Sequence, residues 1–195
     1  MTEPTEPTGR RERKKAATRQ KIADTALRLF LERGYDEVGI REVAAEADVA
    51  VTTVFSHFAS KEALVFERDQ DFEQRLTRAV TDRSPGEALI PALRREIHAM
   101  VRHCTAEGAD PIWRLIDGSP ALREYEESMR LRHAESLAAA IAARPAPARS
   151  ATACRAIARF VVGAFSLARE AADPEAAVDE VFRMIEAAWD ATGGA

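Results

Sequence analysis

A run of small and hydroxyl-bearing side chains near residue 50 is the part of this chain best suited to specific chemistry. Residues 51–57 read VTTVFSH. If they form a helix, Val54 faces inward together with Phe58, which follows the run. The opposite face then presents Val51, Thr52, Thr53, Ser56 and His57. Groups of this size can approach base edges and phosphates closely, so the run could contact a nucleic acid.

A second short helix is predicted just before this run, and this helix would position residues 51–57. The apolar residues of 39–47 fall at i, i+3, i+4 and i+7, the one-sided stripe of a helix packed on a core. They are Ile40, Val43, Ala44 and Ala47. Asp48 follows, and Asp tolerates the left-handed conformation that closes a helix better than most residues. Two short helices around such a turn predict a helix-turn-helix, whose second helix is the recognition helix.

Helices are also predicted on both sides of this pair. Residues 18–33 have their apolar side chains on one face and end at Gly34, a natural left-handed C-cap. A connecting helix is expected over residues 61–81, with Ser60 as its N-cap. Lys61 in its first turn is unfavourable for the helix dipole, which suggests that this side chain has a phosphate partner.

The N-terminal segment is strongly basic although the whole chain has a net charge of −4. Residues 10–21 contain seven basic side chains and one acidic one, Glu12. We expect residues 1–17 to be a flexible basic arm. The arm could be a solubilising tail, but next to a helix-turn-helix it is better explained as a segment that binds phosphates or the minor groove.

The sequence of residues 18–64 resembles the DNA-binding domain of the TetR (tetracycline-repressor) family. The residues that carry the resemblance are Ile22, Ala26, Leu29, Phe30, Arg33, Gly34, Tyr35, Ile40, Val43, Ala44, Val49, Thr53, Phe55, His57, Phe58, Lys61, Glu62, Ala63 and Leu64. It implies a ligand-responsive transcriptional regulator, most simply a repressor released from a palindromic DNA operator by a small apolar effector. It also implies an all-α homodimer, with a three-helix DNA-binding domain at 18–64 and a larger helical ligand-binding and dimerisation domain at 65–195.

Some positions depart from the family pattern. Val38 and Gly39 stand where a pair of Thr or Ser residues is usual, Ala50 replaces a Ser cap, and Phe55 replaces a Tyr. These changes remove hydroxyl contacts to the DNA backbone, and Ala in place of a Ser cap costs about 1 kcal/mol. The expected DNA-binding residues are Gly39, Arg41, Val51, Thr52, Thr53, Phe55, Ser56, His57 and Lys61.

Five further helices are expected after a Ser-Pro-Gly break at residues 84–86. They should cover residues 85–105, 110–117, 120–144, 148–172 and 174–192. Ser119 and Asp173 are each followed by Pro and should be the N-caps of the third and the last of these helices. The last two are apolar over more of their circumference than one buried face requires, so they are either internal or at an interface. The resemblance favours the interface, because TetR-family dimers form through their last two helices. The candidate dimer residues are Phe165, Val178, Phe182, Ile185 and Trp189.

Several apolar residues between these regions could line an effector pocket. They are Ile97, Met100, Cys104, Trp113, Ile116, Tyr125, Met129 and Phe160. Ordinary core packing explains the same spacing. Trp113, Tyr125 and Met129 are the better ligand candidates, because an aromatic ring with a polar group or a flexible thioether suits an adaptable cavity.

Other classes of protein find less support in the sequence. No signal peptide or apolar run of about 20 residues is evident, so a cytoplasmic protein is expected. Cys104 and Cys154 lack metal-site spacing, and His98 and His103 lie about 140° apart around a helix, so no metal or cofactor is expected. No arrangement of side chains typical of a catalytic site is evident in the sequence, so we do not expect an enzyme. The alternatives are an all-helical small-molecule-binding protein or enzyme without DNA binding, or a protein-interaction module.

Overall fold

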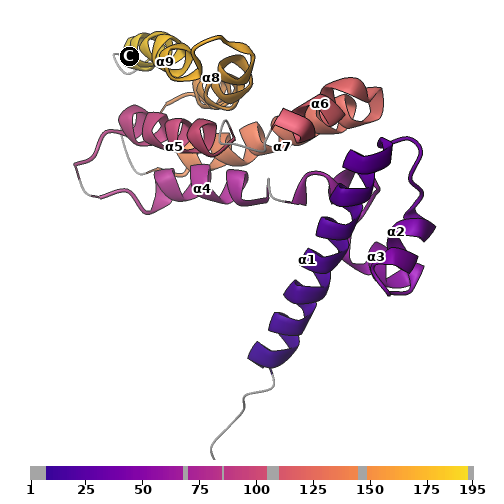
Figure 1. Ribbon diagram of the computed structural model, residues 1–195. Helices are drawn as coiled ribbons and strands as arrows, with labels where there is room; N and C mark the ends of the chain where they lie inside the picture. Colours follow the sequence, from indigo (N-terminus) through magenta and orange to yellow (C-terminus); the bar gives the residue numbers. More distant parts are fainter. Residues whose placement is uncertain (1–7, 68–69, 85, 105–109, 145–148, 193–195) are drawn as a thin grey trace, which may run out of the picture. The chain divides into compact units, whose positions relative to one another are not determined.

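A computed structural model of the chain describes residues 8–67, 70–84, 86–104, 110–144 and 149–192. These residues form nine α-helices and one 3-10 turn, and they contain no strand (Figure 1). The all-α prediction is confirmed. The elements are α1 (Thr8–Arg33), α2 (Ile40–Glu46), α3 (Val51–His57), η1 (Glu62–Leu64), α4 (Gln70–Thr81), α5 (Leu89–Cys104), α6 (Asp110–Gly118), α7 (Pro120–Ala142), α8 (Ala151–Glu170) and α9 (Pro174–Ala191).

The chain divides into two compact units. The first contains α1, α2, α3, η1 and nearly all of α6, and the second contains α4, α5, most of α7, α8 and α9. The first unit is built on one face of α1, where Ile22, Ala26 and Phe30 are fully buried. Gly34 ends the helix with φ +93°, and its N–H donates to the carbonyl of Phe30 at 2.8 Å. The predicted C-cap is therefore confirmed.

Helix α1 begins ten residues earlier than expected. Residues 8–17, predicted to be part of a flexible arm, are helical and exposed from residue 9 onward. Residues 10–17 contain only Arg, Lys, Glu and Ala, which are among the best helix formers, so an exposed helix is favourable there. The rest of the predicted arm, residues 1–7, lies outside the described residues.

The helix-turn-helix has the predicted geometry. The turn contains Asp48, which has φ +52° as expected for the residue that closes α2. Val43 and Ala44 of α2 and Val54 of α3 are buried against α1. Neither helix receives a hydrogen bond from an N-cap side chain, because the caps are Gly39 and Ala50. This agrees with the sequence analysis.

The continuous connecting helix expected over residues 61–81 is wrong. The chain forms the single turn η1 at Glu62–Leu64, and α4 starts at Gln70. Leu64, Val65 and Phe66 are consecutive and all buried. A regular helix with one buried stripe cannot bury three consecutive side chains, so packing in the first unit overrides the helical pattern.

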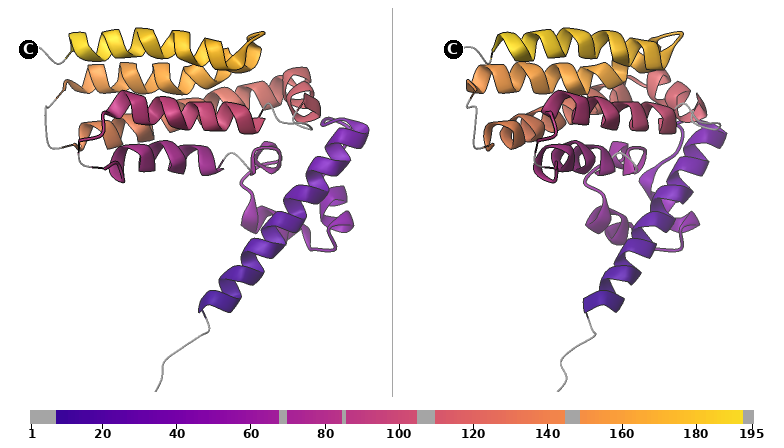
Figure 2. Two further views of the ribbon diagram at one scale, coloured as in Figure 1. Left: turned by 60° about the vertical axis from the view of Figure 1, so that its left-hand side comes forward. Right: turned by 90° about the vertical axis from the view of Figure 1, so that its left-hand side faces the viewer.

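The second unit is a helical bundle (Figure 2). Its core joins α4, α5, α7, α8 and α9, with the largest contribution from α5 and α8. Helix α9 packs along α8 and also against α5. The core includes Leu76, Val80, Leu93, Ile97, Leu137, Ile141, Ile157, Val161, Phe182 and Ile185.

Helix α8 is long and apolar enough to cross a membrane by length and composition. Arg155 and Arg159 interrupt it, so it is not a continuous apolar run. Ile157, Ala158, Val161 and Ala164 of α8 lie in the bundle core, which accounts for its apolar character.

The two predicted Ser/Asp-Pro helix starts differ in the structure. The side chain of Asp173 accepts a hydrogen bond from the N–H of Ala176 at 3.0 Å and caps α9, as predicted. Ser119 precedes Pro120 at the start of α7, but its hydroxyl oxygen is buried without a hydrogen-bond partner. Its predicted capping role is wrong.

Candidate nucleic-acid interface

Helix α3 presents an accessible face made of the residues predicted to contact DNA. Thr52, Phe55 and Ser56 are exposed. Val54, which faces the core, is 1% exposed. Phe55 is 55% exposed, which is unusual for an aromatic side chain that serves a core. The remaining predicted contacts from α3, Val51, Thr53 and His57, are half-buried.

The hydroxyl groups on this face are not equivalent. Ser56 Oγ donates to the backbone carbonyl of Thr53 at 2.7 Å. Its hydrogen is therefore occupied, and Ser56 can only accept a hydrogen bond from a DNA base until that bond breaks. Thr52 makes no such bond among the described residues, so it is the freer of the two hydroxyl groups.

Arg19 of α1 fixes the end of α3. Its Nε donates to Glu67 Oε1 at 2.6 Å, its Nη2 pairs with the second oxygen of Glu67, and its Nη1 donates to the carbonyl of His57. The guanidinium carbon also lies 4.3 Å from the centroid of the Phe58 ring. Arg19 was expected to belong to the basic segment that holds DNA phosphates, but its donors support α3 instead.

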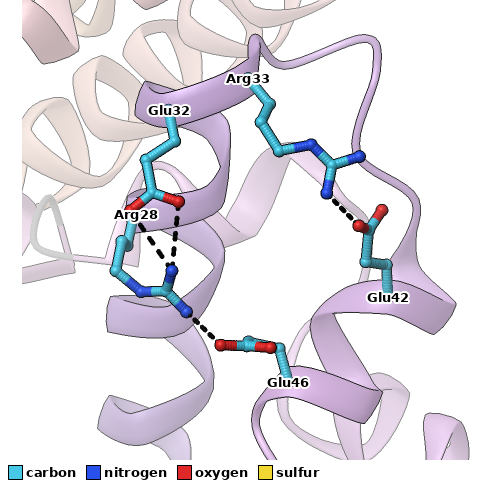
Figure 3. A network of polar contacts seen from close by, with 5 residues as sticks. All are labelled: Arg28, Glu32, Arg33, Glu42 and Glu46. Carbon is cyan, nitrogen blue, oxygen red and sulfur yellow. Dashed lines mark hydrogen bonds and ion pairs between the residues drawn. The ribbon is translucent and has the colours of Figure 1, made fainter.

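A second set of ion pairs joins α1 to α2 (Figure 3). Arg28 pairs with Glu46 at 2.6 Å and with Glu32 at 3.2 Å, and Arg33 pairs with Glu42. All five side chains are more than a third exposed, so each pair contributes little to stability. The pairs Arg28–Glu46 and Arg33–Glu42 link the exposed faces of α1 and α2.

Lys61 is engaged inside the first unit. Its Nζ donates to the backbone carbonyl of Tyr35 at 2.6 Å and lies 4.0 Å from the centroid of the Tyr35 ring. Burial lowers the pKa of Lys61. Because no long helix begins at this residue, no helix dipole opposes the charge of Lys61. A phosphate contact for Lys61 stays a prediction, and it would have to compete with these bonds.

His57 lies at the end of α3. We call the bonds of Arg19 to Glu67 and to the His57 carbonyl the Arg19 clamp. Burial, followed by the positive charges of Arg19 and Lys15, lowers the pKa of His57 below its ordinary value of 6.5. The lowered pKa favours the neutral imidazole, whose ring N–H can donate a hydrogen bond to a phosphate.

Exposed positive charge continues along the N-terminal half of α1. Six of its seven basic residues are exposed, and in the described part of the chain none of the six has a carboxylate partner. They are Arg10, Arg11, Arg13, Lys14, Lys15 and Lys21. Such a surface attracts a phosphate backbone without selecting a sequence. Gly39 and Arg41, at the start of α2, are exposed as well.

Comparisons with known proteins identify the fold and its role. The sequence model described as "Bacterial regulatory proteins, tetR family" matches residues 22–67. The HTH-type transcriptional repressor Rv3405c of Mycobacterium tuberculosis is 32% identical over 136 residues, which cover 70% of this chain and 69% of the relative. The chain belongs to the TetR family. It is a DNA-binding transcriptional regulator with a helix-turn-helix, and not an enzyme.

Two further relatives extend this result. The HTH-type transcriptional regulator TcmR of Streptomyces glaucescens is 33% identical over 143 residues, and the match covers 67% of this chain but only 63% of TcmR. A solved TetR-family regulator from Streptomyces coelicolor A3 has a TM-score of 0.64 at 18% identity, covering 88% of this chain and 93% of that one. At this identity the structural likeness shows the TetR-family fold alone.

The predicted effector-binding residues of this TetR-family chain are distributed over both units. Ile97 and Met100 are buried in the core of the second unit, Cys104 is half-buried at the end of α5, and Tyr125 and Met129 are half-buried on α7. The remaining three residues lie on neither α5 nor α7. Trp113 and Ile116 belong to α6 of the first unit, and Phe160 of α8 is 55% exposed.

The predicted dimer residues are largely internal. Val178, Phe182 and Ile185 are at most 1% exposed and lie in the core of the second unit. Phe165 packs against the ring of Phe72 with centroids 5.2 Å apart, and Trp189 also packs against the core. Val178, Phe182 and Ile185, which were expected at a dimer interface, therefore lie in the core of one chain instead.

Three other apolar side chains of the last two helices are exposed. Phe160 and Leu167 of α8 are each 55% exposed, and Met184 of α9 is 60% exposed. We call these three residues the α8–α9 patch. Phe160 and Leu167 are seven residues apart, a spacing that puts them on one helix face and could have been found in the sequence.

Proposed function

We propose that this TetR-family protein is a cytoplasmic homodimer that occupies a palindromic operator and represses transcription until a small, largely apolar effector releases it. The observation that carries the DNA part is the accessible face of α3 on a helix held by the Arg19 clamp. A rigid recognition helix can dock without a large ordering cost. Two such helices related by a two-fold axis match a palindromic site.

Within this proposal the contacts divide into two groups. Val51, Thr52 and Ser56 read bases, and the exposed ring of Phe55 can pack against a thymine methyl group or a sugar. The backbone is held by Gly39, Arg41, Thr53, His57, Lys61 and the basic residues of α1. The DNA-binding domain is then residues 18–64, to which α1 adds the exposed basic residues before residue 18.

Substitutions at Thr52 and Arg41 should separate the two groups. Thr52→Ala is expected to change the preferred operator sequence, because it removes the freest hydroxyl on α3. Arg41→Ala is expected to weaken binding to all sequences alike and to lower the slope of log K against log salt by about one unit. Selection from a random DNA library followed by salt titrations measures both effects.

Arg78→Ala is the matched control for Arg41→Ala. Arg78 is an exposed arginine of α4 in the second unit, with no ion pair among the described residues. It should leave the salt slope unchanged. The proposed division is wrong if Arg41→Ala alters the preferred sequence at constant affinity, or if Arg78→Ala lowers the slope as much as Arg41→Ala.

Release by an effector is supported by what is typical of the family and by the flexible or aromatic side chains on α5 and α7, such as Met100, Tyr125 and Met129. Coupling between two sites is usually about 1–3 kcal/mol and is reciprocal. Any compound that raises the melting temperature of the protein in a metabolite screen binds the folded state. Such a compound should bind operator-bound protein about 5- to 150-fold more weakly than free protein. Equal affinities in the two titrations would reject release by that compound.

A further inference from the structure

Three arginines gather at one end of the second unit. Arg83 follows α4, Arg144 follows α7, and Arg149 comes just before α8. In both views of Figure 2 the ends of α4, α7 and α9 and the start of α8 lie at this end of the bundle. Burial, and then the positive charges of Arg83 and Arg149, lower the pKa of Arg144, so each of these two charges lies close enough to Arg144 to repel it.

Two of these guanidinium groups are held in place through Nη1. Arg149 stacks on Trp189, with its Cζ 3.7 Å from the ring centroid. Its Nη1 donates to the Trp189 carbonyl at 2.5 Å and to Thr192 Oγ1 at 2.7 Å. Arg83 donates from Nη1 to the backbone carbonyl of Glu87. These bonds satisfy carbonyl groups and fix the orientation of both side chains.

The Nε groups of the same two arginines have no such role. Both Nε atoms are buried and have no hydrogen-bond partner. A buried donor without a partner is costly and requires an explanation, and one explanation is a bound ion or water. In arginine, Nε and Nη2 form one of the planar edges that bind an oxyanion with two parallel hydrogen bonds.

No carboxylate neutralises this cluster among the residues that the structure describes. The nearby carboxylate of Glu87 accepts a hydrogen bond from Arg95 at 2.6 Å. That bond is the main reason why the pKa of Glu87 is lowered. Arg144 has no described side-chain contact that would offset its charge. Satisfying backbone carbonyls explains the Nη1 bonds, but it does not explain the two unpaired Nε groups or the position of Arg144.

We propose that Arg83, Arg144 and Arg149 bind the phosphate group of a small molecule, either free phosphate or a phosphomonoester. A phosphate dianion carries more charge than a carboxylate and has three acceptor oxygens for three guanidinium groups. This site uses none of the residues assigned to DNA binding. Its test is therefore independent of the proposed function.

Titration of the full-length protein with inorganic phosphate and with phenyl phosphate tests the proposal. Ionic strength is held constant with NaCl, and the ¹⁵N–¹H signals of the arginine Nε groups are followed by NMR. Saturable shifts of the Nε signals of Arg83 and Arg149 are expected. Tighter binding of inorganic phosphate would indicate a site for the free ion, and tighter binding of phenyl phosphate a site for a phosphorylated metabolite.

Arg144→Gln is the decisive variant, because Arg144 makes no described side-chain contact on which the fold depends. It should weaken binding about 10-fold or more, the usual effect of losing one charge-assisted hydrogen bond. Arg78→Gln, an exposed arginine of the same unit, is the control and should bind as wild type does. The proposal is overturned if the shifts do not saturate, if Arg144→Gln binds as tightly as wild type, or if both variants lose affinity equally.

Discussion

Arg19→Met is expected to destabilise the end of α3 by about 2–4 kcal/mol, more than any other single change in the first unit outside its apolar core. The substitution leaves the Glu67 carboxylate, whose side chain is 15% exposed, without its bidentate partner. It also removes the donor to the His57 carbonyl. Breaking a buried ion pair by removing one partner costs about 3–5 kcal/mol, and partial exposure reduces that cost here. Hydrogen exchange of the α3 amides measures the change directly.

Two further variants show whether the clamp itself is responsible. Lys21→Met changes an exposed basic residue of the same helix and should alter the opening free energy by less than about 0.5 kcal/mol. The double variant Arg19→Met with Glu67→Met should recover part of the loss, because it also removes the carboxylate that lost its bidentate partner. If Arg19→Met is no more disruptive than Lys21→Met, Arg19 does not hold α3.

The helix-turn-helix could be predicted closely because its signals are local. The apolar spacing of α2, the left-handed residue Asp48 and the glycine that ends α1 each depend on a few neighbouring positions. The same sequence window fixes the buried face of α3 through Val54. Local patterns of this kind specify both the elements and the direction in which Thr52 points.

The support for the site could not be predicted in the same way. Arg19 and Glu67 are 48 positions apart, and nothing in the spacing of either one indicates the other. Within a basic segment, Arg19 looks the same as Lys15 or Lys21. Only the packing of α1 against the end of α3 assigns it a different role. The break after Lys61 also depends on tertiary packing, because three consecutive buried residues override a helical pattern.

The last two helices show a second kind of limit. Both α8 and α9 are apolar over much of their circumference, so the sequence alone left open whether this surface is internal or at an interface. In the structure, one part of this apolar surface is buried and another part is exposed. Phe182 and Ile185 face the core, whereas Phe160, Leu167 and Met184 remain exposed. Dimerisation through the α8–α9 patch therefore rests on different residues from those first expected.

Glutamate at Phe160 or at Leu167 should convert the proposed dimer into a monomer. Burying a charge in an apolar interface without a partner is strongly unfavourable, while an exposed glutamate costs a monomer little. Loss of the second recognition helix should then weaken operator binding about 100-fold or more, because two linked contacts gain that much over one. Sedimentation velocity gives the oligomeric state, and operator titration gives the affinity.

Controls on the same two helices separate an interface from a core. Ala151→Glu lies about 180° around α8 from Phe160, at an exposed position in the first turn, and should leave the oligomeric state unchanged. Ile185→Glu should instead unfold the second unit, because Ile185 is 1% exposed within the core. If both Phe160→Glu and Leu167→Glu remain dimeric, the interface lies elsewhere on the chain. If wild type itself sediments as a monomer, docking at a palindromic operator requires two separate binding events, and the proposed homodimer is wrong.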